Sequence, residues 1–276
     1  MRAALSRQSG TIAVLLAVTA VLAAPTTAGA NVEQTAVIDT TPALDVDYVP
    51  TPMPTVRLML EMADVKADDH VVDLGSGDGR ILVTAASQYG VRSAIGVELD
   101  PWLVQWARAR ADEAGVGDRV RFIEADLFET DFADADVVTM YLLPQINLRL
   151  RPYILTRLSP GTRIVSHSFD MGDWQPDARA EMYTKPIFMW VVPAQVAGTW
   201  KIERKPGDPP LMLQLHQQFQ HLEGNASVGG NAVQVDDLRL SGRDIRFRIG
   251  DDVFEGRVEG GTMHSTGALP WTAQNR

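Results

Sequence analysis

The chain contains no cysteine, so it can form no disulfide framework, and this absence suits a reducing or an oxidising compartment equally. Basic residues are also few, because 25 lysines and arginines stand against 35 aspartates and glutamates, a formal net charge of −10. Such an acidic chain is a poor partner for nucleic acid. A cationic target would be attracted to it, although acidic surfaces also serve solubility alone.

The apolar run near the N-terminus is short. Ile12 to Ala24 gives 13 residues, which are too few to span a bilayer comfortably. Arg2 and Arg7 precede this run and Ala28-Gly-Ala30 follows it, which is the form of a secretory signal peptide cleaved after Ala30. We therefore expect an exported protein, periplasmic or extracellular, with no stable transmembrane span after cleavage. An uncleaved membrane anchor is the alternative.

The dinucleotide fingerprint is incomplete. Residues 71–80 read as an apolar strand that enters a loop with Gly75, Gly77 and Gly79. Glycine tolerates positive φ and has no Cβ, so such a loop lets the backbone approach a ligand closely. The sixth position of G-x-G-x-x-G holds Arg80 instead of glycine. A nucleoside-containing small molecule is thus the first hypothesis, and NAD or FAD is the runner-up.

Polar residues follow each of the first four predicted strands. Asp73 precedes the glycines, Glu98 lies about twenty residues after the loop, and Asp126 and Tyr141 follow the next two strands. An acid at position 98 can accept both ribose hydroxyls; alternatively, it complements the dipole of the helix after it. The strands are expected at 71–74, 94–97, 120–123 and 136–140, and the helices at 56–63, 78–89 and 101–114.

With these motifs, residues 48–192 resemble the class I S-adenosylmethionine-dependent methyltransferases. The resemblance implies a Rossmann-like α/β sheet with helices on both faces and S-adenosyl-L-methionine as cofactor. Tyr141 to Pro144 stands at the catalytic motif after strand four but lacks the Asn/Asp-Pro-Pro-Tyr form, so DNA-adenine and glutamine methylation are less expected. The implied cofactor-binding residues are Asp73, Gly75, Ser76, Gly77, Asp78 and Gly79 for the methionine part, Glu98 for the ribose, and Asp126 and Leu127 beside the adenine.

A closer similarity is carried by Tyr48-Val-Pro-Thr-Pro52, the Asp-Leu-Gly-Ser-Gly-Asp-Gly-Arg loop and Leu142-Leu-Pro-Gln145. These segments resemble the mitochondrial protein-lysine methyltransferases that act on ATP synthase and on the adenine nucleotide translocase. The similarity implies that Thr51 lies over the cofactor and that a lysine-bearing protein is the methyl acceptor.

Tyr141 and His167 are the candidate catalytic residues. His167 ends the apolar strand 164–166, where an open α/β sheet places its ligand crevice, and a neutral imidazole there could take a proton. In the alternative interpretation, Ser166, His167 and Ser168 satisfy only one another and the nearby backbone. By position, Asp170 and Trp174 are expected to shape the acceptor pocket.

The chain divides into a methyltransferase domain at 48–195, preceded by a linker at 31–47, and a smaller module at 196–276. Strands at 179–183 and 187–192 are expected to form the terminal hairpin of the first sheet. Beyond residue 196 the apolar period changes to two and glycines bound the strands, which predicts a small antiparallel β domain. His216 and His221 are expected on opposite faces of one strand, so no shared metal is predicted.

Together these features predict a methyltransferase that transfers a methyl group by in-line displacement, with a protein lysine amine as the expected acceptor. The alternative is a non-catalytic exported protein that binds a nucleoside or another small molecule on the same fold.

Overall fold

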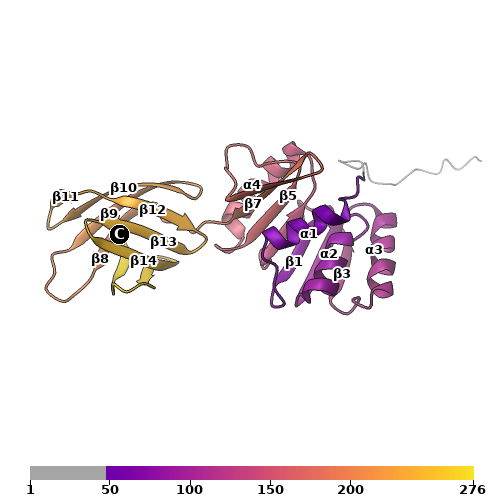
Figure 1. Cartoon of the computed structure of the whole chain (residues 1–276), viewed down its shortest axis with the longest axis horizontal. Coiled ribbons are helices and arrows are strands. Elements are labelled where there is room, and N and C mark those ends of the chain that lie inside the picture. Colours follow the sequence, from indigo (N-terminus) through magenta and orange to yellow (C-terminus); the bar gives the residue numbers. More distant parts are fainter. Residues whose placement is uncertain (1–47) are drawn as a thin grey trace, which may run out of the picture. The chain divides into compact units, whose positions relative to one another are not determined.

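The computed structural model describes residues 48–276, and the signal peptide and linker expected at 1–30 and 31–47 lie outside the described residues. Two β-sheets form from consecutive stretches of the chain, coloured indigo to rose and orange to yellow in Figure 1. The first sheet has seven strands and carries helices, and the second has nine strands. This confirms the predicted α/β fold with a C-terminal antiparallel β region.

The first sheet has the strand order β3-β2-β1-β4-β5-β7-β6. Its first five strands are parallel, whereas β7 runs antiparallel to β5 and pairs with β6 as the predicted hairpin. The strands are β1 (His70–Leu74), β2 (Ser93–Glu98), β3 (Val120–Glu124), β4 (Val137–Met140), β5 (Arg163–His167), β6 (Ala178–Met182) and β7 (Lys185–Val191).

Helices cover both faces of this sheet. They are α1 (Met53–Met62), α2 (Arg80–Thr84), α3 (Pro101–Glu113) and α4 (Pro144–Arg157), with one π-helical turn, η1 (Ala85–Tyr89). Val71 packs in the core under α1, α2 and α3, and its neighbour Val72 packs in the core under α4. All five residues of β1 are buried, as expected for a central parallel strand covered on both faces.

The helix predicted at 78–89 differs in two respects. It begins at Arg80, because Gly79 has a φ of 76° and lies outside the helical region. It also changes to a π turn at Ala85, where the hydroxyls of Thr84 and Ser87 donate to the carbonyls four residues earlier. Such hydrogen bonds from side chains to carbonyls one turn earlier compete with the backbone hydrogen bonds of a regular helix and bend it.

The second sheet is entirely antiparallel, and one face of it buries an apolar core that includes Trp200, Phe247 and Phe254. His216 lies on β9 and His221 on β10, so the prediction that one strand carries both was wrong; a turn at 219–220 separates the strands. The strands are β8 (Gly198–Glu203), β9 (Leu211–Gln218), β10 (His221–Val228), β11 (Asn231–Val233), β12 (Asp236–Ser241), β13 (Asp244–Ile249), β14 (Asp252–Glu259), β15 (Thr262–Ser265) and β16 (Thr272–Asn275).

Within residues 48–276, no helix combines the length and apolar character that crossing a bilayer requires. The same residues contain no group of three or more histidine, aspartate and glutamate side chains arranged to hold a metal ion.

Candidate active site

A pocket opens where the strand order of the first sheet reverses. β1 pairs with β2 on one side and with β4 on the other, and ligands of open α/β sheets bind at the carboxyl ends of strands at such a point. The pocket holds about 960 Å³ of space between protein atoms, part of it open to solvent. Its walls come from the residues after β1, β2, β3 and β4 and from the segment before α1.

The structure brings together most of the residues predicted from the sequence. Tyr141 lines the pocket, whereas Gly79 and His167 do not. The predicted cofactor-binding residues that do line it are Thr51, Asp73, Gly75, Ser76, Gly77, Asp78, Glu98, Asp126 and Leu127.

The backbone of the glycine loop has a conformation in which residues other than glycine would be strained. Gly75, Gly77 and Gly79 have φ angles of 72°, 53° and 76°. None has room for a side chain: a Cβ at Gly75 would approach Leu142 at 2.8 Å, and one at Gly77 would approach the Tyr48 ring at 2.6 Å. The loop is therefore a cradle formed by main chain, and a ligand can approach its N–H groups closely.

Gly79 has a different role from the other two glycines. A Cβ there would overlap with the ring of Phe122 and approach the Cβ of Ala107 at 2.9 Å. Gly79 thus permits close packing of α2 against β3 and α3, which explains why it lies outside the pocket wall.

Asp73 is a buried carboxyl group in the pocket wall. Its side chain accepts a hydrogen bond from Thr139 Oγ1 at 2.7 Å. Burial raises the pKa of Asp73 to about 8, against the lowering effect of the Thr139 hydrogen bond and with smaller contributions from the charges of Glu98 and Asp78. A buried carboxyl with no ion-pair partner among residues 48–276 is poised to receive a cation, which would restore its charge.

Glu98 joins β2 to the glycine loop. One carboxylate oxygen accepts from the Gly77 amide at 2.8 Å, and the other accepts from the amides of Leu99 and Asp100 at 2.8 and 3.0 Å. The N-cap of α3 is Asp100, whose side chain accepts from the Trp102 amide. Glu98 is thus not the capping acid of the helix, and its carboxylate is fixed at the pocket wall.

Asp126 and Leu127 follow β3 and form another part of the wall. Asp126 is exposed, and its carboxylate accepts from the Phe128 amide at 2.8 Å in a turn. This bond fixes the turn, while Leu127 adds half-buried apolar surface. A polar edge beside an apolar surface suits a flat heterocycle.

Arg80 and Tyr48 are pocket residues to which the sequence motifs assigned no role. Arg80 donates from Nη1 to the Thr51 carbonyl at 3.0 Å and forms an ion pair with Asp78 at 2.7 Å. Arg110 of α3 pairs with the same carboxylate at 2.8 Å. Burial alone would raise the pKa of Asp78, but its contacts with the two arginines outweigh burial and hold that pKa below its usual range.

Asp78 therefore supports the cradle, and its charge is already compensated. The sequence did contain a signal for Arg80, since it occupies the place of the missing sixth glycine. Tyr48 was visible only as part of a family motif. The structure places Tyr48 in the site, because its ring lies against Gly77 and lines the pocket.

His167 lies behind the pocket wall. It is buried, its Nδ1 is 3.3 Å from Thr51 Oγ1, and its ring centroid is 4.1 Å from that of Tyr141. Burial, with a smaller effect of Lys185, lowers the pKa of His167 to about 4. A base this weak would take a proton from an ammonium group poorly, so the structure favours a role for His167 in holding Thr51 and Tyr141.

The expectation that Trp174 shapes the acceptor pocket was wrong. Its ring is fully buried against Trp190, with centroids 5.9 Å apart, and its carbonyl accepts from Trp190 Nε1. Asp170 also lies outside the pocket wall. A large apolar ring close to a sheet gains more by joining the core than by facing water.

Comparison with known proteins agrees with this geometry. The model of the ANTKMT methyltransferase domain matches residues 73–178. A protein-lysine N-methyltransferase of Saccharolobus islandicus is 47% identical over 131 residues, which cover 48% of this chain and 81% of that protein. A lysine N-methyltransferase of Xenopus laevis, named for ATP synthase, is 37% identical over 130 residues, covering 47% of this chain and 56% of that protein.

A solved structure is also similar. The crystal structure described as an RNA methyltransferase from Salinibacter ruber, in complex with S-adenosyl-L-homocysteine, is 51% identical with a TM-score of 0.52. The alignment covers 54% of this chain and 96% of that one.

The fold and pocket define an S-adenosylmethionine-dependent methyltransferase, which is an enzyme and not the non-catalytic binding protein of the alternative interpretation. The chain belongs to the family that includes the Saccharolobus protein-lysine N-methyltransferase. It spans little more than half the length of the Xenopus relative, and the similarity lies within the methyltransferase domain.

S-adenosyl-L-methionine is the cofactor of this fold, and the residues present suit it. Its positive charge matches a pocket with four acidic side chains and one arginine, namely Asp73, Asp78, Glu98, Asp126 and Arg80, and the cation would favour the ionised form of Asp73. The glycine loop also presents main chain rather than side chains to the pocket, because a Cβ at Gly75 or Gly77 would clash with Leu142 or Tyr48.

Proposed function

We propose that this protein methylates the side-chain amine of lysine in a protein acceptor. The observation that carries the proposal is the charge of the pocket. Its one arginine is already paired with Asp78, while Asp73, Glu98 and Asp126 have no cationic partner within residues 48–276. Such a pocket favours a cationic cofactor and a cationic acceptor. Relatives named for lysine methylation support the same acceptor.

In the proposed reaction, the lysine amine would attack the methyl carbon of the cofactor's sulfonium in line, so that the N–C bond forms as the S–C bond breaks and the neutral thioether leaves. The protein must align the two groups and exclude water, which can lower the barrier by roughly 7 to 11 kcal/mol. Tyr141, Leu142 and Ile146 form the wall on the β4 side, and Leu142 and Ile146 are buried apolar residues. We assign the alignment of the amine to this wall.

Lysine must lose a proton before it can attack. With a reference pKa of about 10.4, this costs on the order of 4 to 5 kcal/mol at pH 7. Apolar surface beside the amine lowers its pKa by desolvation, so the wall supplies part of this energy without a strong base. We propose that Tyr141 directs the amine lone pair and that His167 holds the Tyr141 ring.

RNA is the competing acceptor, since the Salinibacter structure is described as an RNA methyltransferase. The net charge of −10 opposes binding to a polyanion. Transfer of radioactive methyl groups to lysine-containing peptides but not to RNA oligonucleotides is the expected result. Labelling of RNA alone would overturn the lysine proposal and leave the methyltransferase assignment intact.

We also propose that the protein is exported, on the basis of the signal-peptide pattern in residues 1–30. N-terminal sequencing after cell fractionation tests this proposal. A chain that begins at Asn31 outside the cytoplasmic membrane supports it, and an intact Met1 in the cytosol contradicts it. Export would require cofactor from the cytosol, which makes this measurement important for the acceptor search.

A further inference from the structure

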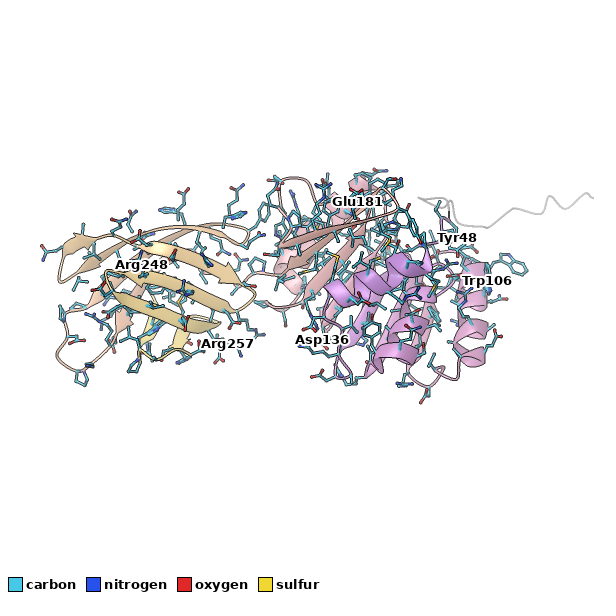
Figure 2. All side chains as sticks on the ribbon, in the orientation of Figure 1. Tyr48, Trp106, Asp136, Glu181, Arg248 and Arg257 are labelled. Atoms are coloured by element: carbon cyan, nitrogen blue, oxygen red, sulfur yellow. The ribbon has the colours of Figure 1, made fainter. Side chains whose placement is uncertain are left out.

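Two tryptophans of α3 are exposed to solvent. Trp102 is 77% exposed and Trp106 is 53% exposed, and they lie one turn apart on the same face of the helix. Figure 2 shows Trp106 projecting away from the body of the domain. Large aromatic side chains in such positions are typical of surfaces that bind a partner.

The chain that carries this face also contributes to the pocket. Leu99 and Leu103, which flank Trp102 along the chain, both line the pocket. On the other side of the glycine loop, Tyr48 and Val49 also line it and are 37% and 58% exposed. We call Tyr48, Val49, Trp102 and Trp106 the aromatic rim.

A chain of ion pairs, with a cation–π contact at one end and a hydrogen bond at the other, connects the two parts of the rim. The Arg110 guanidinium lies 5.6 Å from the centre of the Trp106 ring and pairs with Asp78. Asp78 pairs with Arg80, which holds the Thr51 carbonyl beside Tyr48 and Val49. The rim is therefore held on one framework, so it can bind a partner without first ordering its own backbone.

We infer that the aromatic rim docks the polypeptide of the methyl acceptor, and that it selects a lysine flanked by apolar side chains. This inference rests on the lysine proposal above and specifies the acceptor. The carboxylates inside the pocket would attract the lysine, while the aromatic rim outside the pocket would bury the side chains next to that lysine. Tryptophan and tyrosine are the residues that most often dominate such contacts.

The test compares two synthetic peptides of equal length, each with one lysine. In one peptide leucine and phenylalanine flank the lysine, and in the other serine and glutamine do. The wild-type full-length chain should methylate the apolar peptide with a KM roughly tenfold lower. The double variant Trp102→Ala, Trp106→Ala should lose this preference and keep its kcat and its affinity for S-adenosylmethionine.

Alanine favours a helix, so the double variant should fold. The matched control is Tyr183→Ala, because Tyr183 is a 63% exposed aromatic residue in the turn between β6 and β7, outside the pocket wall. This control should retain the preference for the apolar peptide.

Three outcomes would contradict the inference. Equal KM values for the two peptides with the wild-type chain, or an unchanged preference in the double variant, would show that the rim does not dock the acceptor. Loss of binding to phosphatidylcholine vesicles in the double variant, without any change in peptide KM, would assign the tryptophans to a membrane surface. Methylation of neither peptide by a wild-type chain that binds cofactor would instead overturn the lysine proposal itself.

Discussion

The two sheets use glycine in different ways. In the first, Gly75, Gly77 and Gly79 combine positive φ with neighbours that would clash with a side chain. In the second, Gly250 and Gly260 also have positive φ, but nothing lies within 4 Å of a Cβ placed there. The second group serves only the turns between strands, whereas the first also makes room for a ligand and for close packing.

This contrast extends to polar residues. Asp73 is fully buried in the first sheet at a site where a cation would stabilise its charge. Charged side chains of the second sheet form ion pairs at its surface, such as Arg257 with Asp244 and Arg246 with Glu255. The first sheet thus holds a buried carboxyl group that a cationic ligand would stabilise, whereas these charged side chains of the second sheet already compensate one another.

The largest expected effect tests whether the two sheets are independent. Phe254 stacks on Phe247 with ring centroids 4.7 Å apart and is almost fully buried. Phe254→Ala should lower the stability of the second sheet by about 3 to 5 kcal/mol. Calorimetric titration at low temperature should show unchanged affinity for S-adenosylmethionine. A large loss of affinity would show that the cofactor site depends on the second sheet.

The next effect concerns the glycine that permits packing. Gly79→Ala combines a left-handed backbone, which costs about 1 to 2 kcal/mol, with overpacking against Phe122 and Ala107, which costs about 1 to 3 kcal/mol. Urea denaturation should report a loss of roughly 2 to 5 kcal/mol in the free energy of unfolding. The matched control Gly250→Ala has the same backbone strain without the clash, so it should lose only about 1 to 2 kcal/mol.

Asp73→Asn should affect stability and binding in opposite directions. The free protein holds the Asp73 carboxyl in a site that disfavours its charge, so the variant should unfold at a higher temperature at pH 7 and above. Losing a charge-assisted contact of about 1.5 to 3 kcal/mol should weaken binding of S-adenosylmethionine roughly 10- to 150-fold. A variant that binds like wild type would remove Asp73 from the cofactor site.

Stability should also depend on pH through the same residue. The folded state keeps the Asp73 proton up to pH about 8, whereas an unfolded aspartate loses it near pH about 4. Between these values the folded state binds more protons, so wild-type stability should fall as pH rises from 4 to 8 relative to Asp73→Asn. Urea melts of both proteins at about pH 5 and about pH 8 measure this difference.

Cofactor affinity should show the opposite trend. If the bound cation requires an ionised Asp73, binding releases a proton below pH 8, and wild-type affinity should rise with pH by up to about tenfold per unit until about pH 8. The cofactor's own amino group titrates nearby, so Asp73→Asn at each pH is the control. A wild-type affinity that follows the variant at every pH would contradict this linkage.

Much of the first domain was predictable because its signals are local. Apolar strands that end in Asp73, Glu98 and Asp126 lie about twenty to thirty residues apart, which is the repeat of a βαβ unit, and the glycine loop fixes the first turn. The residues after these strands then meet at one edge of the sheet for topological reasons alone. His167 and Trp174 were harder to interpret, because His167 ends β5 and Trp174 lies in the connection after it, and only packing decides whether such a side chain faces a pocket or the core.

The sequence by itself thus determined the fold class and the set of residues at the strand ends, since both follow from local pattern and the handedness of strand–helix–strand connections. The cofactor followed from the resemblance of these motifs to a known family. The tertiary structure alone decided the state of these residues. It buried Asp73 and raised its pKa, compensated Asp78 with Arg80 and Arg110, and placed His167 behind Tyr141. The physical reason is that burial and charge pairing depend on which side chains, distant along the chain, pack together.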